Sequence, residues 1–472
     1  MGRQISKDKV YITTAIDYAN EVIHIGHAFQ KVLADILARY WRMKGKKVFF
    51  LTGTDEHGAN IEQKAKQEKK DPQEYVDEIS SLDKEELKSL NISYDRFIRT
   101  TDQDHIQTVK WFWKRIKEKE DVYLKEFSGL YCLGCESFKT PHEIVDGKCP
   151  LHPTQDLVKV SEENYFFRWS KYEPFLKDLL KKHKDFIVPS SRYKEMVNFL
   201  NQGLEDISVS RKSVKWGIPV PGKESEQVFY VWFEALMNYY TGAKNNGFWD
   251  DNTYIIHIMG KDNLRWHALL WPAILKSAEL RMPDVILGHG FCSLNGQKIS
   301  KSRGNFIRAK DLVEQTSQDA VRYFLAKYGP LRDDADISLE KVKKAYNSEL
   351  ANNLGNLIQR VCRLAEKNNC LVKKAEDLSF YSQVDNFIQD FKLDFALNFI
   401  GQKLDALNKL LDEEKPWAQP ASQAQEIISQ VITELRQICY NLYPFLPLSM
   451  DKALKIINQD KIKTGQPLFP RL

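Results

Sequence analysis

Two histidines, His24 and His27, flank Gly26 between a β-rich stretch at 10–16 and a segment whose apolar residues have helical spacing. Free N–H groups and the dipole at the start of a helix attract anions, and each imidazole adds a donor. Gly26 would let a nucleotide lie close to the backbone. The segment is a candidate phosphate site, although a short His-x-x-His at a helix start is more often a cap or a chance match.

A second basic pair, Lys298 and Lys301, lies in the segment KISKSRGN. Two lysines on a short loop could clamp a triphosphate, although an isolated pair of this kind is more often a solvated turn. The histidine motif follows the first expected strand, and the lysine motif follows the last. Ligands of parallel sheets bind at the carboxyl ends of the strands, so the two motifs together predict one site.

A group of cysteines has the spacing of a metal site. Cys132-x-x-Cys135 is followed by Cys149-x-x-His152, and three thiolates with one imidazole would close a tetrahedral structural Zn²⁺ site. His142 is a competing fourth ligand with less suitable spacing, and a cluster without metal is the alternative. The scattered cysteines are expected to be buried small apolar side chains: Cys292, Cys362, Cys370 and Cys439.

The elements that must position these motifs follow an α/β pattern. The stretch 10–16, a helix over 27–45 and a strand from Lys47 form a β–α–β unit, which implies a parallel sheet. From Asp121 to Gly222 the periodicity weakens and Pro, Gly, Cys and aromatic residues become frequent, as in an inserted domain.

The α/β pattern resumes near Val228. Strands are expected over 254–260 and 284–291, with a helix over 264–278 between them. From about Leu350 to the end, apolar residues recur at three and four, which predicts a helix bundle.

Length and composition narrow the class of protein. A chain of 472 residues is too long for one hydrophobic core, and 43% hydrophobic with 28% charged residues is typical of a soluble globular protein. The net charge of +5 permits a polyanionic partner without requiring one. No apolar run reaches the roughly 18 to 20 residues of a membrane span, and the start lacks the apolar core of a signal peptide. Gly2 and Ser6 match a loose myristoylation pattern, for which chance is the preferred explanation. A cytoplasmic protein is expected.

Taken together, the motifs resemble the class I aminoacyl-tRNA synthetases, whose signatures read HIGH and KMSKS. The methionyl branch is the most similar, over essentially the whole chain. Its further motifs are similar to the segments 15–20, 52–58, 230–236 (its methionine-pocket strand) and 260–271. The sequence departs from the usual pattern at a few positions: Asp17 and Glu21 replace proline and glycine, Glu234 replaces aspartate, Ile299 replaces methionine and Arg303 replaces a frequent lysine.

The resemblance implies that L-methionine is activated with ATP and transferred to tRNA(Met), including the initiator. The methionine carboxylate attacks the α-phosphorus without a general base, and His24, His27, Lys298 and Lys301, with Mg²⁺, supply a positive field. A thioether slot built of aromatic and apolar side chains makes chemical sense by itself. The implied methionine contacts are Ile16, Tyr18, Asp55, Trp232, Ala235, Leu236, Tyr239, His267 and Trp271. The implied ATP contacts are Gly26, Arg211, Gly260, Asp262, His289, Cys292 and Lys301.

Three residues near the C-terminus resemble the anticodon-reading residues of this branch. Asn356 and Arg360 lie one helical turn apart, and Trp417 follows Lys415 and Pro416. Polar groups can read the base edges of a CAU anticodon, and an indole can stack on a base. The alternative is a surface pair with a buried tryptophan.

The expected fold class is α/β: a Rossmann-type parallel-sheet catalytic domain, an inserted zinc-knuckle connective domain that shapes an acceptor-stem contact, and a C-terminal α-helical bundle. The expected boundaries are 1–118 and 226–296 for the catalytic halves, 119–225 for the insertion, 297–345 for the domain that links the lysine loop, and 346–472 for the anticodon-binding bundle.

Other functions are less consistent with the sequence. Synthetases for leucine, isoleucine or valine carry a large editing insertion, and those for cysteine place zinc at the amino-acid pocket. A non-catalytic tRNA-binding relative would not need all four motif residues. The chain shows no appended dimerising module, so a monomer without membrane or DNA partners is expected.

Overall fold

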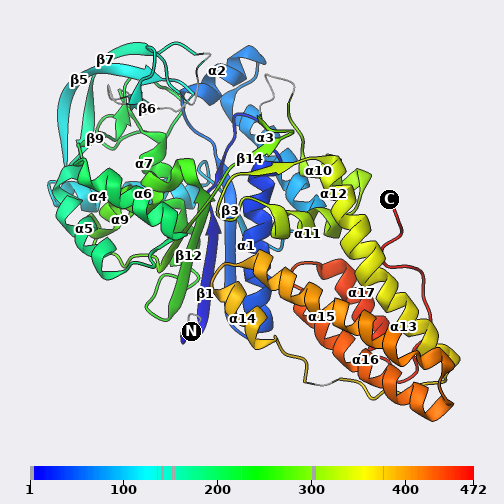
Figure 1. Ribbon diagram of the computed structural model, residues 1–472. Coiled ribbons are helices and arrows are strands. Elements are labelled where there is room, and N and C mark those ends of the chain that lie inside the picture. Colours follow the sequence, from blue (N-terminus) through cyan, green and yellow to red (C-terminus); the bar gives the residue numbers. More distant parts are fainter. Residues whose placement is uncertain are drawn as a thin grey trace.

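The computed structural model describes residues 5–134, 137–139, 143–150, 153, 155–224, 226–299, 305–375 and 377–472, and gives only the backbone of residues 137 and 298. An α/β part and a helical part lie side by side in it (Figure 1).

The centre of the α/β part is a seven-stranded sheet in the order β2-β3-β1-β12-β13-β8, with β4 beside β3. Every pair of neighbours in it is parallel. Its strands are β1 (Lys9–Thr14), β2 (Asp17–Tyr18), β3 (Lys47–Asp55), β4 (Arg96–Arg99), β8 (Ile187–Val188), β12 (Thr253–Gly260) and β13 (Val285–His289). The expected parallel sheet is confirmed. Its long strands β1, β3, β12 and β13 are largely buried, because helices cover both faces.

Helix α1 (Ile25–Met43) lies between the sheet and the helical part (Figure 1). It is buried on almost every side, including Lys31 and Asp35. Both charges are paired, Lys31 with Asp17 at 2.7 Å and Asp35 with Arg39 at 2.6 Å. A buried charge is tolerated when it is paired and hydrogen-bonded. The remaining helices of the first half are α2 (Ala59–Gln67), α3 (Pro72–Ser89) and α4 (Gln103–Glu118).

The insertion is an antiparallel sheet followed by two helices. The long strands β5 (Val122–Cys132) and β7 (Val158–Phe167) form an arch at one end of the molecule (Figure 1). Its other elements are β6 (Ser137–Lys139), β9 (Ile207–Ser208), α5 (Glu173–Lys182) and α6 (Ser190–Asn201), followed by the short pair β10 (Ser210–Arg211) and β11 (Val228–Phe229). Strand β8 lies between the two helices in sequence and joins the edge of the central sheet, so the insertion is integrated with the parallel sheet.

One expectation about the second half was wrong. The segment 230–236, expected as a strand, forms α7 (Val231–Ala235), and α8 (Asn238–Lys244) follows. Its residues are buried on nearly all sides, so the sequence has no polar face to reveal a helical period.

The helix expected over 264–278 is irregular. It contains a π-helical turn at Trp266–Leu270 before α9 (Trp271–Ser277). The break coincides with Pro272, which has no N–H to continue the regular ladder.

The lysine motif was expected to follow directly after the last strand of the central sheet, but it does not. It follows β15 (Gln297–Lys298), which pairs with β14 (Cys292–Leu294) in a separate three-stranded sheet with β16 (Ala335–Ile337). Three helices continue this region: α10 (Ala309–Gln315), α11 (Gln318–Tyr328) and α12 (Leu339–Ala345).

A helix bundle forms the C-terminal part, as expected. It follows a π-helical segment at Tyr346–Gly355 and contains α13 (Asn356–Lys367), α14 (Ser382–Gln389), α15 (Leu393–Glu414), α16 (Ala421–Leu442) and α17 (Pro447–Ile457). No helix in the described part of the chain is long and apolar enough to cross a membrane.

Arg322 of α11 connects the two parts. Its side chain is fully buried and lies 2.7 Å from Asp35 of α1. It also donates to the carbonyls of Pro444 and Phe445 in the bundle and of Leu90 after α3, at 3.0 to 3.1 Å. The guanidinium therefore fixes the bundle against the helix that begins at the histidine motif.

Candidate active site

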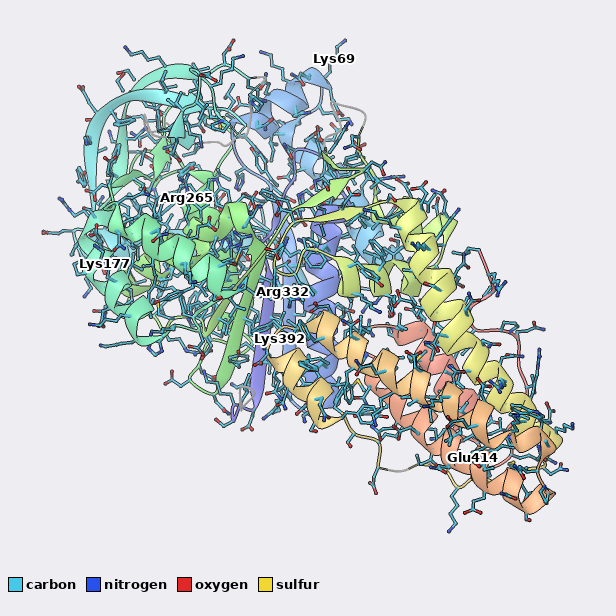
Figure 2. All side chains as sticks on the ribbon, in the orientation of Figure 1. Lys69, Lys177, Arg265, Arg332, Lys392 and Glu414 are labelled. Atoms are coloured by element: carbon cyan, nitrogen blue, oxygen red, sulfur yellow. The ribbon has the colours of Figure 1, made fainter. Side chains whose placement is uncertain are left out.

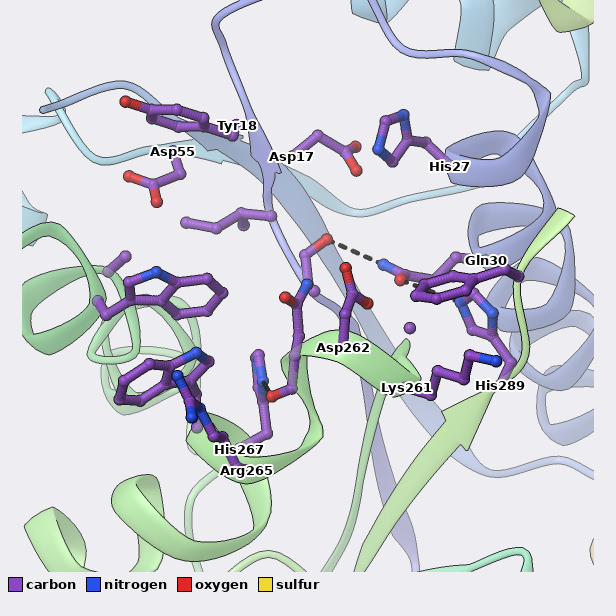
Figure 3. A pocket seen from close by; sticks show the side chains of 18 of the residues that line it. Asp17, Tyr18, His27, Gln30, Asp55, Lys261, Asp262, Arg265, His267 and His289 are labelled. Carbon is purple, nitrogen blue, oxygen red and sulfur yellow. Dashed lines mark hydrogen bonds between the residues drawn. The ribbon is translucent and has the colours of Figure 1, made fainter. Parts of the chain in front are cut away.

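A cavity of about 820 Å³ opens at the carboxyl ends of β1, β3, β12 and β13 (Figure 3). In Figure 3, Tyr18 and Asp55 lie toward one end and His27, Gln30 and His289 toward the other, with Asp262 between them. The structure brings most of the expected contacts together here: Ile16, Tyr18, His24, Gly26, His27, Asp55, Trp232, Ala235, Leu236, Tyr239, Gly260, Asp262, His267, His289 and Cys292.

Four expected residues are not placed in this lining. Trp271 is fully buried behind it, where its indole N–H donates to His257 at 3.3 Å. Arg211 packs against the rings of Tyr230, Phe138 and Tyr131 and donates to Ser208, so it is held away from the cavity. The side chain of Lys298 and the whole of Lys301 lie outside the described residues, and their role stays a prediction.

Gly26 also makes room for a neighbouring side chain, because a β-carbon there would lie 2.8 Å from the ring of His24. The expected approach of a nucleotide to Gly26 stays a prediction. Gly260 has a comparable constraint, because its β-carbon would lie 2.6 Å from Asp262 Oδ1. Cys292, expected to be buried, is half-buried in the lining.

His24 and His27 form the cap of α1 and stack on each other with ring centroids 4.0 Å apart. The Nδ1 of His24 accepts from the N–H of Gly26 at 3.0 Å, and the Nδ1 of His27 accepts from the N–H of His24 at 3.3 Å. A neutral imidazole has one donor and one acceptor nitrogen. Since both Nδ1 atoms accept, each Nε2 carries the proton and can donate to a phosphate.

The surroundings of both rings favour the neutral form. Desolvation, followed by the proximity of His27, lowers the pKa of His24 well below its usual value. Desolvation, followed by the ammonium of Lys31, lowers the pKa of His27. That these histidines supply positive charge to bound phosphates stays a prediction. They supply oriented N–H donors beside the N-terminus of α1.

The floor beneath them contains residues that sequence reasoning missed. Lys31 is completely buried, and its ammonium contacts Asp17 at 2.7 Å and the carbonyl of Ala15 at 3.1 Å. Gln30 donates to the same carbonyl at 2.9 Å (Figure 3). Burial raises the pKa of Asp17, although Lys31 opposes this shift. The available signal was the spacing of Lys31, one helical turn after His27 on the same face.

The other end of the cavity suits an apolar side chain that contains one polarizable atom. The Nδ1–H of His267 donates to the carbonyl of Asn263 at 2.8 Å, so its Nε2 accepts the hydroxyl proton of Tyr239 at 2.7 Å. Burial lowers the pKa of His267 to about 4, which keeps the ring neutral. Trp232 stacks on Trp266 at 5.3 Å, and Ala235 and Leu236 complete the wall. The side chains of Trp232, Ala235, Leu236 and Tyr239 are uncharged, so the slot they form is suited to a thioether.

Comparison with known proteins agrees with this geometry. The family described as tRNA synthetases class I (M) matches residues 10–160 and 140–362. This chain is a class I tRNA synthetase of the M group. The methionine–tRNA ligase of Caldanaerobacter subterraneus subsp. tengcongensis is 37% identical to it over 99% of this chain and 79% of that protein. The one from Synechocystis is 37% identical over 92% of this chain and 87% of that protein.

A solved structure is similar over the whole synthetase. The methionyl-tRNA synthetase of Mycobacterium tuberculosis in complex with methionyl-adenylate has a TM-score of 0.90 at 32% identity. The match covers 98% of this chain and 100% of that one. The likeness therefore includes the insertion and the bundle as well as the sheet.

The synthetase holds its amino-acid pocket in place with a buried carboxylate. Glu234 of α7 accepts from His57 Nδ1 and His105 Nε2, each at 2.8 Å. Burial alone would raise its pKa, but His57 and then His105 outweigh burial and lower the pKa of Glu234. The longer side chain at this position, where aspartate is usual, spans two histidines from different elements. Glu234 thus joins α7 to α4 and to the loop after Asp55.

Replacing Glu234 by alanine should lower the free energy of unfolding by roughly 3 to 5 kcal/mol, because two imidazole N–H groups lose their buried acceptor. Glu234→Asp should lose less stability and raise the KM for methionine, since the shorter side chain cannot reach both rings without moving α7. Urea unfolding and pyrophosphate-exchange kinetics of the two variants would measure this. An Asp variant with wild-type stability and KM would show that the bridge does not position the pocket.

The expected anticodon residues also lie together in this synthetase. The guanidinium of Arg360 lies 4.9 Å from the ring centroid of Trp417 and forms an ion pair with Asp412 at 2.6 Å. The side chain of Trp417 is 47% exposed, so the alternative of a buried tryptophan is excluded. Asn356 is exposed one turn before Arg360. In Figure 2, Glu414, close to Trp417 in sequence, lies at the far end of the bundle from Arg265 of the pocket.

The structure describes only part of the expected metal site. Cys132 and Cys149 are buried, while Cys135, His152 and the competing His142 lie outside the described residues. Within the described part of the chain, no group of three or more His, Cys, Asp or Glu side chains is arranged to hold a metal ion. The zinc site stays a prediction.

Proposed function

We propose that this synthetase activates L-methionine with ATP and transfers it to tRNA(Met), the initiator tRNA included. The observation that carries the proposal is a single cavity with two different ends. One end has two neutral Nε2–H donors beside the start of α1, and the other has an uncharged aromatic slot closed by Tyr239 and His267. The names of the relatives, methionine–tRNA ligases, support the same function.

The reaction follows from positions rather than from proton transfer. The methionine carboxylate is already ionised and attacks the α-phosphorus of ATP in line, releasing pyrophosphate. His24 and His27 donate to the phosphate oxygens, the slot around Tyr239 holds the thioether, and Asp55 receives the ammonium group. Mg²⁺, bound with ATP, would neutralise charge on the leaving pyrophosphate. A terminal ribose hydroxyl of tRNA then attacks the mixed anhydride.

The decisive experiment is methionine-dependent ATP–pyrophosphate exchange, followed by charging of a tRNA with the CAU anticodon. We expect exchange with methionine and none with leucine, isoleucine, valine or cysteine. Exchange with one of those amino acids instead would refute the assignment. The absence of exchange with any amino acid would favour a tRNA-binding relative without catalysis.

The arrangement of domains in this proposal has the catalytic halves at 1–118 and 226–296, the connective insertion at 119–225, the linking domain at 297–345 and the anticodon-binding bundle at 346–472. Trp417, Arg360 and Asn356 form the anticodon-reading set. We further propose that the enzyme works as a cytoplasmic monomer.

We also propose one structural zinc ion held by Cys132, Cys135, Cys149 and His152. Two of these ligands, Cys132 at the end of β5 and Cys149, are buried thiols, and a bound metal would hold the knuckle closed. Elemental analysis of chelator-washed protein should find one zinc per chain. Cys132→Ser should weaken tRNA charging more than methionine activation, because the ATP and methionine contacts lie in another domain. A metal-free preparation with full charging activity would contradict this proposal.

A further inference from the structure

Helix α3 carries two buried carboxylates that the chemistry does not use. Asp83 is 1% exposed and Glu86 is 2% exposed, and their spacing places them on one face of the helix. Neither residue lines the cavity. Burying a carboxylate has a large cost unless its hydrogen bonds compensate, so the partners of these two groups indicate what they do.

Each carboxylate accepts a hydrogen bond from a backbone N–H near a different one of the two basic motifs. Asp83 Oδ1 accepts from the N–H of Ile23 at 2.9 Å, immediately before His24. Glu86 Oε2 accepts from the N–H of Lys310 at 2.9 Å, shortly after the loop that contains Lys301.

The two anchored segments also contact each other directly. The N–H of Ile25 donates to the carbonyl of Ile307 at 3.0 Å, and the ring of His24 meets the ring of Phe306 edge to face at 6.1 Å. The histidine motif, the segment after the lysine loop and α3 therefore form a closed triangle. A helix has a fixed rise per residue, so α3 sets the length of one side of this triangle.

We propose that Asp83 and Glu86 are positioning residues that set the separation of the histidine motif from the segment 306–310, which follows the lysine motif, and thereby the affinity for ATP. They act through backbone N–H groups and touch no substrate. This inference rests on the proposed function, because it assigns ATP to the site between the motifs.

The charge state of Asp83 indicates which substitution at this position is conservative. Burial, followed by the proximity of Asp17, raises the pKa of Asp83 to about 8, so the group is mostly protonated at neutral pH. Asp83→Asn keeps an oxygen acceptor of similar shape and carries no charge. Glu86→Gln keeps an acceptor in the same way.

The test compares these variants with Asp83→Ala and Glu86→Ala in methionine-dependent ATP–pyrophosphate exchange. Each alanine variant should raise the KM for ATP roughly tenfold, the effect of losing one buried hydrogen bond, while the KM for methionine changes less than about twofold. The Asn and Gln variants should restore the KM for ATP. The double alanine variant should show a non-additive effect, because both residues set one distance.

Glu85→Ala is the matched control. Glu85 is exposed on the same helix and contacts the ammonium of Lys310 at 3.4 Å rather than its backbone, so its loss should leave the KM for ATP unchanged. If an alanine variant does not fold, the serine variant replaces it, since its hydroxyl is too short to reach the same N–H.

Lower melting temperatures with an unchanged KM for ATP would overturn the inference and leave the two residues a structural role only. Equal changes in the KM for ATP and for methionine would also overturn it. Wild-type protein is assayed first. No exchange with methionine would refute the proposed function itself, whereas normal wild-type exchange with unaffected variants would refute only the positioning role.

Discussion

Replacing His24 by alanine should slow methionyl-adenylate formation about a hundredfold or more, with little change in the KM for methionine. The loss of one donor aimed at charge that develops in the transition state is worth roughly 3 kcal/mol. His24 also caps α1 through Nδ1, so the alanine variant loses a cap as well. His24→Asn separates the two effects, because asparagine is a good N-cap but does not reach as far as Nε2.

We therefore expect His24→Asn to keep the melting temperature of the wild type and to be nearly as slow as the alanine variant. Rapid-quench measurement of adenylate formation and thermal unfolding would test this pair. An Asn variant with full activity would mean that His24 acts only as a cap.

The pH profile gives a second check on the same prediction. A pKa below its usual value means that the ring stays neutral as the pH falls through 6.5, and becomes charged only in stronger acid. Because kcat/KM for ATP reports groups of the free enzyme, its profile should show no inflection near pH 6.5 from these histidines. An inflection there that disappears in His24→Asn would show that a charged ring is the active form.

Replacing Trp417 by alanine should reduce charging of tRNA with the CAU anticodon and leave methionine-dependent pyrophosphate exchange nearly intact. A stacked base contributes roughly 1 to 3 kcal/mol, which corresponds to about a five- to hundredfold loss in kcat/KM for tRNA. The indole of Trp417 is exposed and the guanidinium of Arg360 lies over its ring. An unpaired base that reaches the indole therefore also reaches the guanidinium.

Phe395→Ala is a suitable control for Trp417. Phe395 is also 47% exposed and also packs against an arginine, Arg332, but it lies at the start of α15 rather than near its end. We expect this control to charge tRNA normally. A parallel loss of charging and exchange in Trp417→Ala would indicate that the tryptophan supports the fold, and no loss of either would place anticodon reading elsewhere.

The sequence predicted the parts of the fold in which one physical signal dominates. Strands β1, β3, β12 and β13 are rich in β-branched, aromatic and other apolar residues, and the amphipathic spacing of the C-terminal helices predicted the bundle. The segment 230–236 was misassigned because burial on all sides hides the helical period. The helix that contains Trp266 was predicted, but its π-helical turn was not, because nothing in local spacing distinguishes such a turn.

Most of the candidate site was predicted because the resemblance orders its motifs along the chain, but the resemblance could not give protonation or pairing. The neutral state of His24 and His27 depends on the desolvated walls around them. The burial of Lys31 depends on its partner Asp17. Arg211 lies among Tyr230, Phe138 and Tyr131 because the short strands β10 and β11 pack against the arch formed by β5 and β7. No local sequence pattern reveals this packing.

The buried guanidinium of Arg322 restrains how far the helix bundle can tilt against the α/β part of the enzyme. A tilt of the bundle would remove the carbonyls of Pro444 and Phe445 from a cation that has no water to replace them. Each acceptor lost in that way has a cost of about 1 to 3 kcal/mol or more. Arg322 therefore restrains the bundle where it meets α1 and α11. Under the proposed function, a rigid junction would favour a tRNA whose acceptor end and anticodon fit the distance between the cavity and Trp417.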